Sequence, residues 1–333
     1  MNEQETRLAK ELLSTPKMVA IIPHKSPDGD AMGSTLALYH MLKKKGHEPL
    51  VIAPNDFPPS LAWLPGSEAV MIFERERDAA LDFIASAQLI FALDFNALHR
   101  TGDMEQPLAH SGAPFIMIDH HQEPADFAKV TFSDTSIGST CEMLYYFFEK
   151  TGLAGQIDKT IATCLYTGIV TDTGSFRFAS TTAATHRVAA ELITLGADNA
   201  SVHPALFDNN SYESLQLLGC ALKNLVVMPE YSTSFITLSQ QELDEHHYVK
   251  GDTEGIVNYG LSIKGINFTA IFIEHTDENI VKISFRSKGD VDVNKFARRH
   301  FNGGGHINAA GGKSQLTLTE TVEKFVSIVK GQK

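Results

Sequence analysis

The chain has 333 residues, of which 43% are hydrophobic and 20% charged, a composition typical of a soluble globular protein that excludes a disordered or fibrous one. This length favours two domains of unequal size. Forty acidic against 28 basic residues give a net charge of −12, which disfavours long duplex nucleic acid as a partner and leaves a short nucleotide easier to accommodate.

The sequence contains no segment that predicts export or membrane insertion. Residues 1–17 mix acidic and basic side chains without an apolar core, which favours a short amphipathic helix over a secretory signal. No apolar run approaches the roughly 18 residues of a membrane-spanning helix. The three cysteines, Cys141, Cys164 and Cys220, are widely spaced and form no CxxC pair, so we interpret them as packing residues in a reducing compartment. We therefore expect a cytoplasmic protein without membrane contact.

The first part of the chain alternates β-rich runs with helical patterns, which predicts an α/β fold with a doubly wound, mostly parallel sheet. The predicted strands cover residues 18–23, 49–53, 69–73, 89–93 and 115–118. The predicted helices cover residues 32–45, 138–151, 159–170 and 183–195. We assign residues 1–195 to this first domain.

A different pattern follows a polar stretch rich in His, Asn and Ser, which we interpret as a connector over residues 196–215. Strands are predicted at residues 234–238, 268–274 and 280–285, and helices at 255–261 and 294–300. This arrangement predicts a smaller α+β domain over residues 216–333.

Imidazole and carboxylate side chains follow several of the predicted strands. The ends of neighbouring parallel strands lie about 4.8 Å apart, so such side chains can converge on one pair of metal ions. The predicted ligands are His24, Asp28 and Asp30 in the loop after the first strand, Asp94 after the fourth, His120 after the fifth, and Asp172 at a helix end. Taken singly, an Asp-Gly-Asp run is more often a turn and a lone Asp a helix cap; their occurrence together favours a metal centre.

The absence of cysteine from this set favours Mn²⁺ or Mg²⁺, with Zn²⁺, Co²⁺ and Fe²⁺ as alternatives. Manganese is the first choice because two imidazoles are present. Two divalent ions about 4 Å apart can lower the pKa of a shared water and neutralise charge on phosphoryl oxygens. We expect two such ions.

These residues, in this order, resemble the DHH phosphoesterase superfamily, whose name is spelled here by Asp119, His120 and His121. The four motifs stand at residues 24–34, 94–102, 119–121 and 168–175, and the glycine-rich segment 303–312 resembles the signature of the associated DHHA1 domain. Asn302 departs from the family pattern, which often extends the glycine run at this position. The short two-domain form is similar to the nanoRNase and pAp-phosphatase (bifunctional oligoribonuclease) group, not to the longer RecJ-type exonucleases, the family II pyrophosphatases or the membrane-bound cyclic-dinucleotide phosphodiesterases.

The resemblance implies a division of the ligands between two ions. One ion would be bound by His24, Asp28 and Asp94, and the other by Asp30, Asp94, His120 and Asp172, with Asp94 bridging. His121 would contact substrate or act as an acid, and a purely structural role, orienting the neighbouring ring, is the alternative. Arg100 is a further candidate near the scissile bond.

For the second domain, a substrate-binding role is expected. Glycines allow backbone N–H groups to approach an anion, and basic side chains can bind a terminal phosphate. The candidates are Arg286, Ser287, Gly303, Gly304, Gly305 and His306; Arg298 and Arg299 are equally well explained as solvated surface residues.

The expected activity is 3′-to-5′ release of mononucleotides from RNAs of about two to five residues, together with dephosphorylation of pAp to AMP. The expected partners are therefore short RNA oligonucleotides, pAp and related nucleotides. Two alternatives stay open: a phosphodiesterase acting on pApA or cyclic di-AMP, and a non-catalytic nucleotide- or RNA-binding module. A homodimer is also left open.

Overall fold

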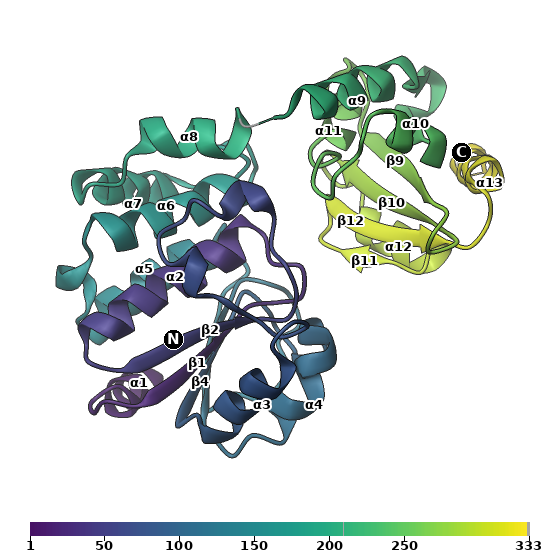
Figure 1. The fold of residues 1–333 in the computed structure, drawn as a ribbon. Coiled ribbons are helices and arrows are strands. Elements are labelled where there is room, and N and C mark those ends of the chain that lie inside the picture. The colour runs from purple at the N-terminus through teal and green to yellow at the C-terminus, as the bar shows by residue number, and fades with distance from the viewer. Residues whose placement is uncertain (209, 332–333) are drawn as a thin grey trace. The chain divides into compact units, whose positions relative to one another are not determined.

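The computed structural model describes residues 1–208 and 210–331 and divides the chain into two compact units, Met1–Asn209 and Asn210–Lys333 (Figure 1). The predicted fold class is confirmed: a parallel sheet covered by helices is followed by a second unit with a mixed sheet. Within the described residues, none of the helices combines the length and the apolar character that crossing a lipid bilayer requires.

Six parallel strands form the sheet of the first unit. They are β1 (Met18–Ile22), β2 (Glu48–Ala53), β3 (Met71–Ile72), β4 (Leu89–Leu93), β5 (Phe115–Asp119) and β6 (Val130–Ser133). Their order is β3-β2-β1-β4-β5-β6, so the chain winds outward in both directions from the pair β1 and β4. In such sheets, ligands bind beyond the carboxyl ends of the strands at this switch point.

Helices cover both faces of this sheet, as an all-parallel sheet requires. The helices of this unit are α1 (Glu3–Leu12), α2 (Gly29–Lys44), α3 (Arg77–Ser86), α4 (Glu105–Ala109), α5 (Thr140–Thr151), α6 (Lys159–Asp172), α7 (Ala183–Thr194) and α8 (Asn199–Phe207). Short 3₁₀ helices lie at Pro59–Leu61, Ser67–Ala69, Leu98–Met104 and Ala154–Gln156. Val19 and Ile21 of β1 face a core shared with α2, α5 and α6, whereas Ala20 and Ile22 face a core shared with α3 and α4.

Two glycines allow α2 and α6 to pack closely. A Cβ on Gly33 would lie 2.6 Å from the carbonyl oxygen of Cys164, and one on Gly168 would lie 2.7 Å from Oδ1 of Asp30. Both distances are shorter than real Cβ contacts, so side chains at these positions would force the helices apart. This packing brings Asp30 on α2 close to the helix that ends at Asp172.

The second unit contains a mixed six-stranded sheet of order β11-β12-β10-β9-β8-β7. Its strands are β7 (Val226–Met228), β8 (Thr233–Leu238), β9 (Phe268–His275), β10 (Ile280–Ser287), β11 (Gly304–Gly305) and β12 (Ala309–Ser314). Its helices are α9 (Tyr212–Lys223), α10 (Gln240–Glu245), α11 (Val257–Ser262), α12 (Val293–His300) and α13 (Leu318–Lys330), with a 3₁₀ turn at Pro229–Tyr231. Phe285 faces α12 and α13, whereas Ile271 faces α9, α10 and α11, so both faces of the sheet are covered.

The structure differs from the predicted connector over residues 196–215. These residues contain the whole of α8, whose Asp198 side chain caps the helix by accepting from Ser201 N, and the start of α9, capped by Ser211. The boundary between the two compact units lies between residues 209 and 210 of the sequence. Polar residues in this stretch are therefore largely helix caps and exposed helix faces.

Candidate metal centre

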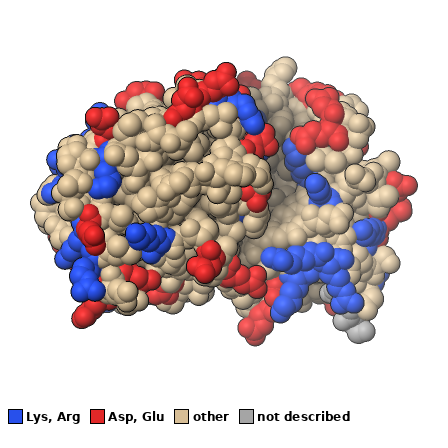
Figure 2. All heavy atoms as spheres, turned by 90° about the horizontal axis from the view of Figure 1, so that it is seen from below, with Lys and Arg blue, Asp and Glu red and all other residues tan. Residues whose placement is uncertain are grey.

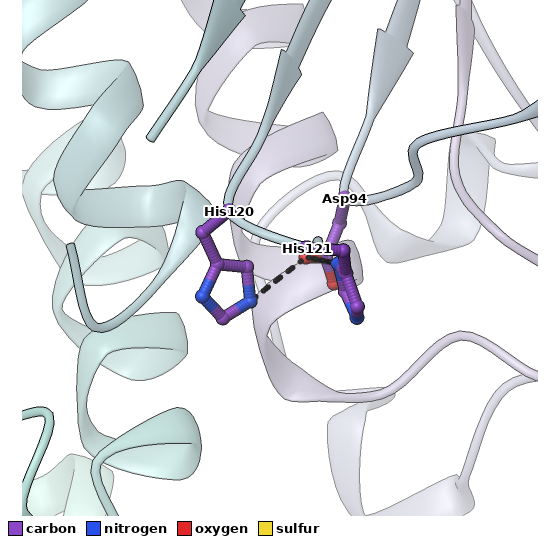
Figure 3. Close-up of side chains that lie close together, drawn as sticks. All are labelled: Asp94, His120 and His121. Atoms are coloured by element: carbon purple, nitrogen blue, oxygen red, sulfur yellow. Dashed lines mark ion pairs between the residues drawn. The ribbon is translucent and has the colours of Figure 1, made fainter. Parts of the chain in front are cut away.

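The predicted ligands meet at the carboxyl edge of the first sheet. His24 lies two residues beyond β1, while Asp94 and His120 directly follow β4 and β5. Figure 3 shows Asp94, His120 and His121 at the ends of neighbouring strands, with both imidazoles near the carboxylate. Since β1 and β4 are the two strands at which the winding reverses, the site occupies the switch point of the sheet.

The first turn of α2 supplies two further carboxylates. Asp28 caps the helix, because its Oδ1 accepts from the amides of Asp30 at 3.0 Å and Ala31 at 3.1 Å. Asp30 is therefore a helical residue, and the prediction that it lies in the loop after β1 was wrong. The helix begins at Gly29, three residues before the predicted start, because Asp28 provides the cap.

Six side chains form two groups, each able to bind one ion. The groups are His24, Asp28 and Asp94, and Asp30, His120 and Asp172; within each, the potential ligand atoms lie within 4.8 Å of one another. His24 Nε2 lies 3.4 Å from Asp94 Oδ2, and His120 Nε2 lies 3.5 Å from Asp94 Oδ1. The two oxygens of Asp94 thus face different groups, as a bridging carboxylate requires.

The geometry fits small divalent ions. In octahedral coordination with bonds of about 2.1 Å, neighbouring ligand atoms lie about 3 Å apart and opposite ones about 4.2 Å. Here His120 Nε2 lies 3.1 Å from Asp172 Oδ2 and 4.0 Å from Asp30 Oδ2, and His24 Nε2 lies 3.9 Å from Asp28 Oδ1. The spacings therefore fall within the range expected of ligands around one ion.

Backbone carbonyls set the tautomers of both imidazoles. Nδ1 of His24 lies 2.9 Å from the oxygen of Lys25, and Nδ1 of His120 lies 3.3 Å from that of Ile137. A carbonyl oxygen only accepts, so each Nδ1 donates its hydrogen. In the neutral ring the lone pair is then on Nε2, the atom that faces the carboxylates, which is the arrangement usual for metal-binding histidines.

The carboxylates concentrate negative charge in a buried place. Burial, followed by the charges of Asp94 and Asp172, raises the pKa of Asp30 well above its usual value. Burial also raises the pKa of Asp172 to about 6, although the hydrogen bond to His120 opposes this shift. Such a cluster needs compensating positive charge, which bound divalent cations would supply.

In the protein without metal, the imidazoles supply that charge. Burial alone would lower the pKa of His24, but its hydrogen bond to Asp94 and the charges of Asp28 and Asp94 outweigh burial and raise the pKa to about 9. Burial is similarly outweighed at His120, where Asp172 is the main partner and the pKa rises to about 11. Asp94 is also buried, yet its bond to His24 and the nearby imidazoles hold its pKa below the usual range.

The Asp94 backbone adopts an uncommon conformation, with φ of +66°. This left-handed region is unfavourable for most residues with a side chain, although Asp and Asn tolerate it better than others. Backbone strain of this kind is frequent at functional sites. The residue with this backbone conformation is the one whose two carboxylate oxygens lie near His24 and His120.

His121 has a different partner from His120. Its Nδ1 lies 2.7 Å from Asp119 Oδ1 but 3.9 Å from Asp94 Oδ1. The main chain supports this pair, since His121 N donates to Asp119 Oδ2 at 3.1 Å. These two hydrogen bonds fix the orientation of the His121 ring. His121 also fits a third group with Asp94 and His120, so a role as a ligand is geometrically allowed.

Arg100 lies in the 3₁₀ segment after β4 and is half-buried. Its carbonyl oxygen accepts from Lys25 N at 2.8 Å, which joins this segment to the loop that follows β1. Arg100 therefore contacts the residue next to His24 through its main chain. Its proposed role near the scissile bond stays a prediction.

The predicted substrate residues of the second unit also come together. Arg286 on β10 pairs with Ala309 on β12, Ser287 N donates to the oxygen of Asn308, and β11 pairs with β12. Burial lowers the pKa of the half-buried Arg286, with the charge of Glu254 acting in the opposite direction. His306 is exposed in the turn between β11 and β12. The end of β10 and the glycine-rich hairpin thus form one region.

The expected anion-binding role of the glycine amides needs correction. Gly303 N donates to the oxygen of Ala297 at 3.3 Å, and Gly305 N donates to Asn294 Oδ1 at 3.0 Å. These glycines instead allow close strand approach, since a Cβ on Gly303 would lie 1.9 Å from the oxygen of Gly311. Basic side chains are therefore the better candidates for binding a phosphate here.

Ser287 also has a structural role that the sequence did not predict. Its hydroxyl donates to the oxygen of Val291 at 2.5 Å and accepts from Asn308 Nδ2 at 2.9 Å. These bonds hold the turn that follows β10. Any contact between Ser287 and a substrate would compete with them.

Three residues that were not predicted as site residues contact the candidate site or its loop. Asp119 orients His121, Thr140 donates to the carboxylates of Asp30 and Asp94, and the buried Asn55 accepts from Ser26 N at 2.6 Å. Ser26 lies between His24 and Asp28 and has φ of +57°. The Ser-Thr-Cys-Glu run at 139–142 carries a capping signal that could have located the start of α5 near the site.

Comparisons with known proteins show the family of this chain. The family described as "DHH family, N-terminal domain" matches residues 18–169, and the "DHHA1 domain" matches residues 233–332. The chain is 31% identical to the bifunctional oligoribonuclease and PAP phosphatase NrnA of Thermus thermophilus, with 98% of this chain and 94% of the relative covered.

Two further proteins are similar over most of this chain. The crystal structure of an exopolyphosphatase-related protein from Bacteroides fragilis superposes with a TM-score of 0.96 at 37% identity, covering 99% of this chain and 96% of that one. The cyclic-di-AMP phosphodiesterase GdpP of Bacillus subtilis is 25% identical over 95% of this chain, which spans 48% of that relative. With both domains matched in order and a relative covered almost end to end, the chain belongs to the DHH/DHHA1 phosphoesterase family.

Proposed function

We propose that this protein is a two-metal phosphoesterase that converts pAp to AMP and releases mononucleotides from short RNAs in the 3′-to-5′ direction. The observation that carries the proposal is the pair of ligand groups shared through Asp94, whose two oxygens face His24 and His120 separately. Its choice of substrate is supported by the similarity to NrnA along nearly the full length of both chains. Mn²⁺ is the first choice of ion because the ligands are carboxylates and imidazoles.

Divalent ions at such a site acidify water and offset the charge that develops on phosphoryl oxygens. The six ligand side chains would fix the positions of the two ions, and the Nδ1 hydrogen bonds of His24 and His120 keep Nε2 available for them. His121 would donate a proton to the leaving oxygen, and Asp119 would hold its ring in place through Nδ1. In this proposal six side chains bind the metal ions, and His121 transfers the proton.

Basic side chains of the second unit would bind the phosphates that are not cleaved. The whole chain is acidic, with a net charge of −12, so attraction of a nucleotide needs a local concentration of cations. Figure 2 shows Lys and Arg side chains gathered on one face of the second unit. Arg286, beside the glycine-rich hairpin, is the candidate best placed by the strand register, and the exposed Arg298 and Arg299 on α12 extend the basic surface.

A second candidate activity is hydrolysis of pApA or cyclic di-AMP. The similarity to GdpP over 95% of this chain favours it, although the chain spans only about half of that relative. The same ligand set would serve either reaction. A non-catalytic binding module is less well supported, because all six predicted ligands are present and close together.

The proposal is tested by a substrate panel with Mn²⁺: pAp, dinucleotide RNA, pApA, cyclic di-AMP and pyrophosphate. We expect pAp and dinucleotide RNA to be cleaved most efficiently and Asp94→Asn to abolish turnover of both. Asp82→Asn, an exposed carboxylate on α3, is the matched control and should behave as wild type. Cleavage of cyclic di-AMP alone would favour the second candidate, and absence of all cleavage with no bound metal would favour the binding module.

A further inference from the structure

Thr140 contacts one carboxylate from each of the two ligand groups. It is fully buried at the first position of α5, where its amide donates to Asp30 Oδ2 at 2.6 Å. Its hydroxyl donates to Asp94 Oδ1 at 2.8 Å. The next amide, that of Cys141, donates to Asp30 Oδ1 at 2.9 Å. The first two residues of α5 thus donate hydrogen bonds to both carboxylates.

These bonds restrict how the carboxylates can turn. Asp94 Oδ1 faces His120 and also accepts from the Thr140 hydroxyl. With one lone pair of this oxygen used by Thr140, the other is available to the group of Asp30, His120 and Asp172. Both oxygens of Asp30 accept from the start of a 12-residue helix, where unpaired amides and the helix dipole favour a negative charge. The orientation of both carboxylates therefore depends on the start of α5.

Other buried threonines of this unit use their hydroxyls differently. Thr35 donates to the oxygen of Ala31, and Thr167 donates to the oxygen of Thr163, both at 2.8 Å within their own helices. These hydrogen bonds stay within one helix, and their acceptors are main-chain carbonyls and not candidate metal ligands. The Thr140 hydroxyl instead crosses to a residue 46 positions away in the sequence. A threonine that only fills space in the core would not need a hydrogen bond to Asp94.

We infer that Thr140 is a positioning residue that fixes Asp30 and Asp94 relative to each other and so sets the spacing of the two ion positions. The inference rests on the proposed two-metal function and adds a determinant of metal affinity outside the ligands. Hydrogen bonds to ligand carboxylates commonly change metal affinity or activity by about 10- to 100-fold when removed.

The test compares Thr140→Val, which keeps the shape but lacks the hydroxyl, with Thr140→Ser, which keeps the hydroxyl. Thr167→Val is the matched control, since it removes an equally buried hydroxyl whose partner is a helix carbonyl. Mn²⁺ affinity and stoichiometry are measured by isothermal titration calorimetry on the full chain, and thermal unfolding is followed without metal. Activity on pAp is then measured as a function of Mn²⁺ concentration.

We expect Thr140→Val to weaken Mn²⁺ binding by about 10- to 100-fold and to recover activity partly at high Mn²⁺, with Thr140→Ser close to wild type. Wild-type affinity in Thr140→Val, or an equal loss in Thr167→Val, would overturn the inference. If Thr140→Val does not fold, Mn²⁺ affinity is measured on Thr140→Ala instead, with the same expected loss. Metal binding is read independently of cleavage, so a wild-type protein that binds two ions but leaves pAp and RNA intact would contradict the proposed substrates and not the role of Thr140.

Discussion

The Nδ1 atom of His121 lies 2.7 Å from Oδ1 of Asp119, closer than to any oxygen of Asp94, whose Oδ1 is 3.9 Å away. An imidazole bound in this way by a buried carboxylate has a fixed ring orientation. Since Asp119 and His121 flank the candidate ligand His120, the three residues at the end of β5 bring a candidate metal ligand next to a candidate proton donor.

We predict that His121→Gln lowers kcat for pAp by about 10²- to 10⁴-fold, the usual contribution of a general acid, while two Mn²⁺ ions still bind. Steady-state kinetics and metal titration check the two parts separately. His110→Gln, an exposed histidine on the same unit, is the control and should leave both unchanged. Loss of one bound ion in His121→Gln would instead identify His121 as a ligand, through its group with Asp94 and His120.

Metal binding should strengthen as the pH rises. His24 and His120 have pKa values raised to about 9 and about 11 in the metal-free protein, so both are protonated at neutral pH. An ion that binds Nε2 must displace a proton there, so lower proton concentration favours the bound state. Below these pKa values, Mn²⁺ affinity should rise by up to about tenfold per pH unit for each proton released.

Calorimetry between pH 6 and pH 8, in buffers of different ionisation enthalpy, counts the protons released on binding. Replacement of His24 by Gln removes one of the two imidazoles and should reduce the proton count by about one. An affinity that stays constant across this range would show that the imidazoles are neutral before the metal binds.

The meeting of the candidate ligands at one edge of the sheet was largely predictable because several of them follow apolar runs of strand length. His24, Asp94 and His120 each come after such a run, and parallel strands place those ends at one edge. Asp30 was misplaced because the Asp-Gly-Asp pattern was interpreted as a loop, although Asp28 caps a helix there. The contacts of Thr140 could not be predicted, since its partners lie 110 and 46 positions away in the sequence.

The second unit was predicted less completely. Strands β11 and β12 consist mostly of Gly and Ala, so they lack the alternation of apolar and polar side chains that indicates a strand. The amides of Gly303 and Gly305 were expected to face an anion, but their acceptors on α12 are visible only in the fold. Glycine runs indicate close backbone approach, and the sequence does not tell whether a ligand or another strand approaches.

Arg286 should contribute to substrate binding more than to the chemical step. Replacement by Gln removes a cation beside the glycine-rich hairpin, and a hydrogen bond to a charged group contributes about 1.5 to 3 kcal/mol. We therefore expect KM for pAp to rise by about 10- to 100-fold with kcat little changed. Lys313→Gln, an exposed cation on the adjacent strand β12, is the control for loss of overall charge. A fall in kcat at constant KM would place Arg286 at the reacting phosphate.

Replacement by alanine should affect the stability of the second unit at one glycine of the hairpin and not at its neighbour. An Ala Cβ at position 303 would lie 1.9 Å from the oxygen of Gly311 and 2.7 Å from the Cα of Gly312, so β11 and β12 would have to separate. At position 304, the nearest atoms lie 3.6 Å away, an ordinary contact. We expect Gly303→Ala to destabilise the second unit by about 1–3 kcal/mol and Gly304→Ala to change its stability by about 0.5 kcal/mol or less.

The only tryptophan, Trp63, belongs to the first unit, so its fluorescence does not report on the hairpin directly. Hydrogen exchange of the β11 and β12 amides is the suitable measurement, because it follows opening of this strand pair itself. Faster exchange in Gly303→Ala than in Gly304→Ala is expected. Equal protection in both variants would mean that the glycines are not required for strand packing, and a weaker affinity for pAp in Gly304→Ala alone would restore the idea that this segment contacts an anion.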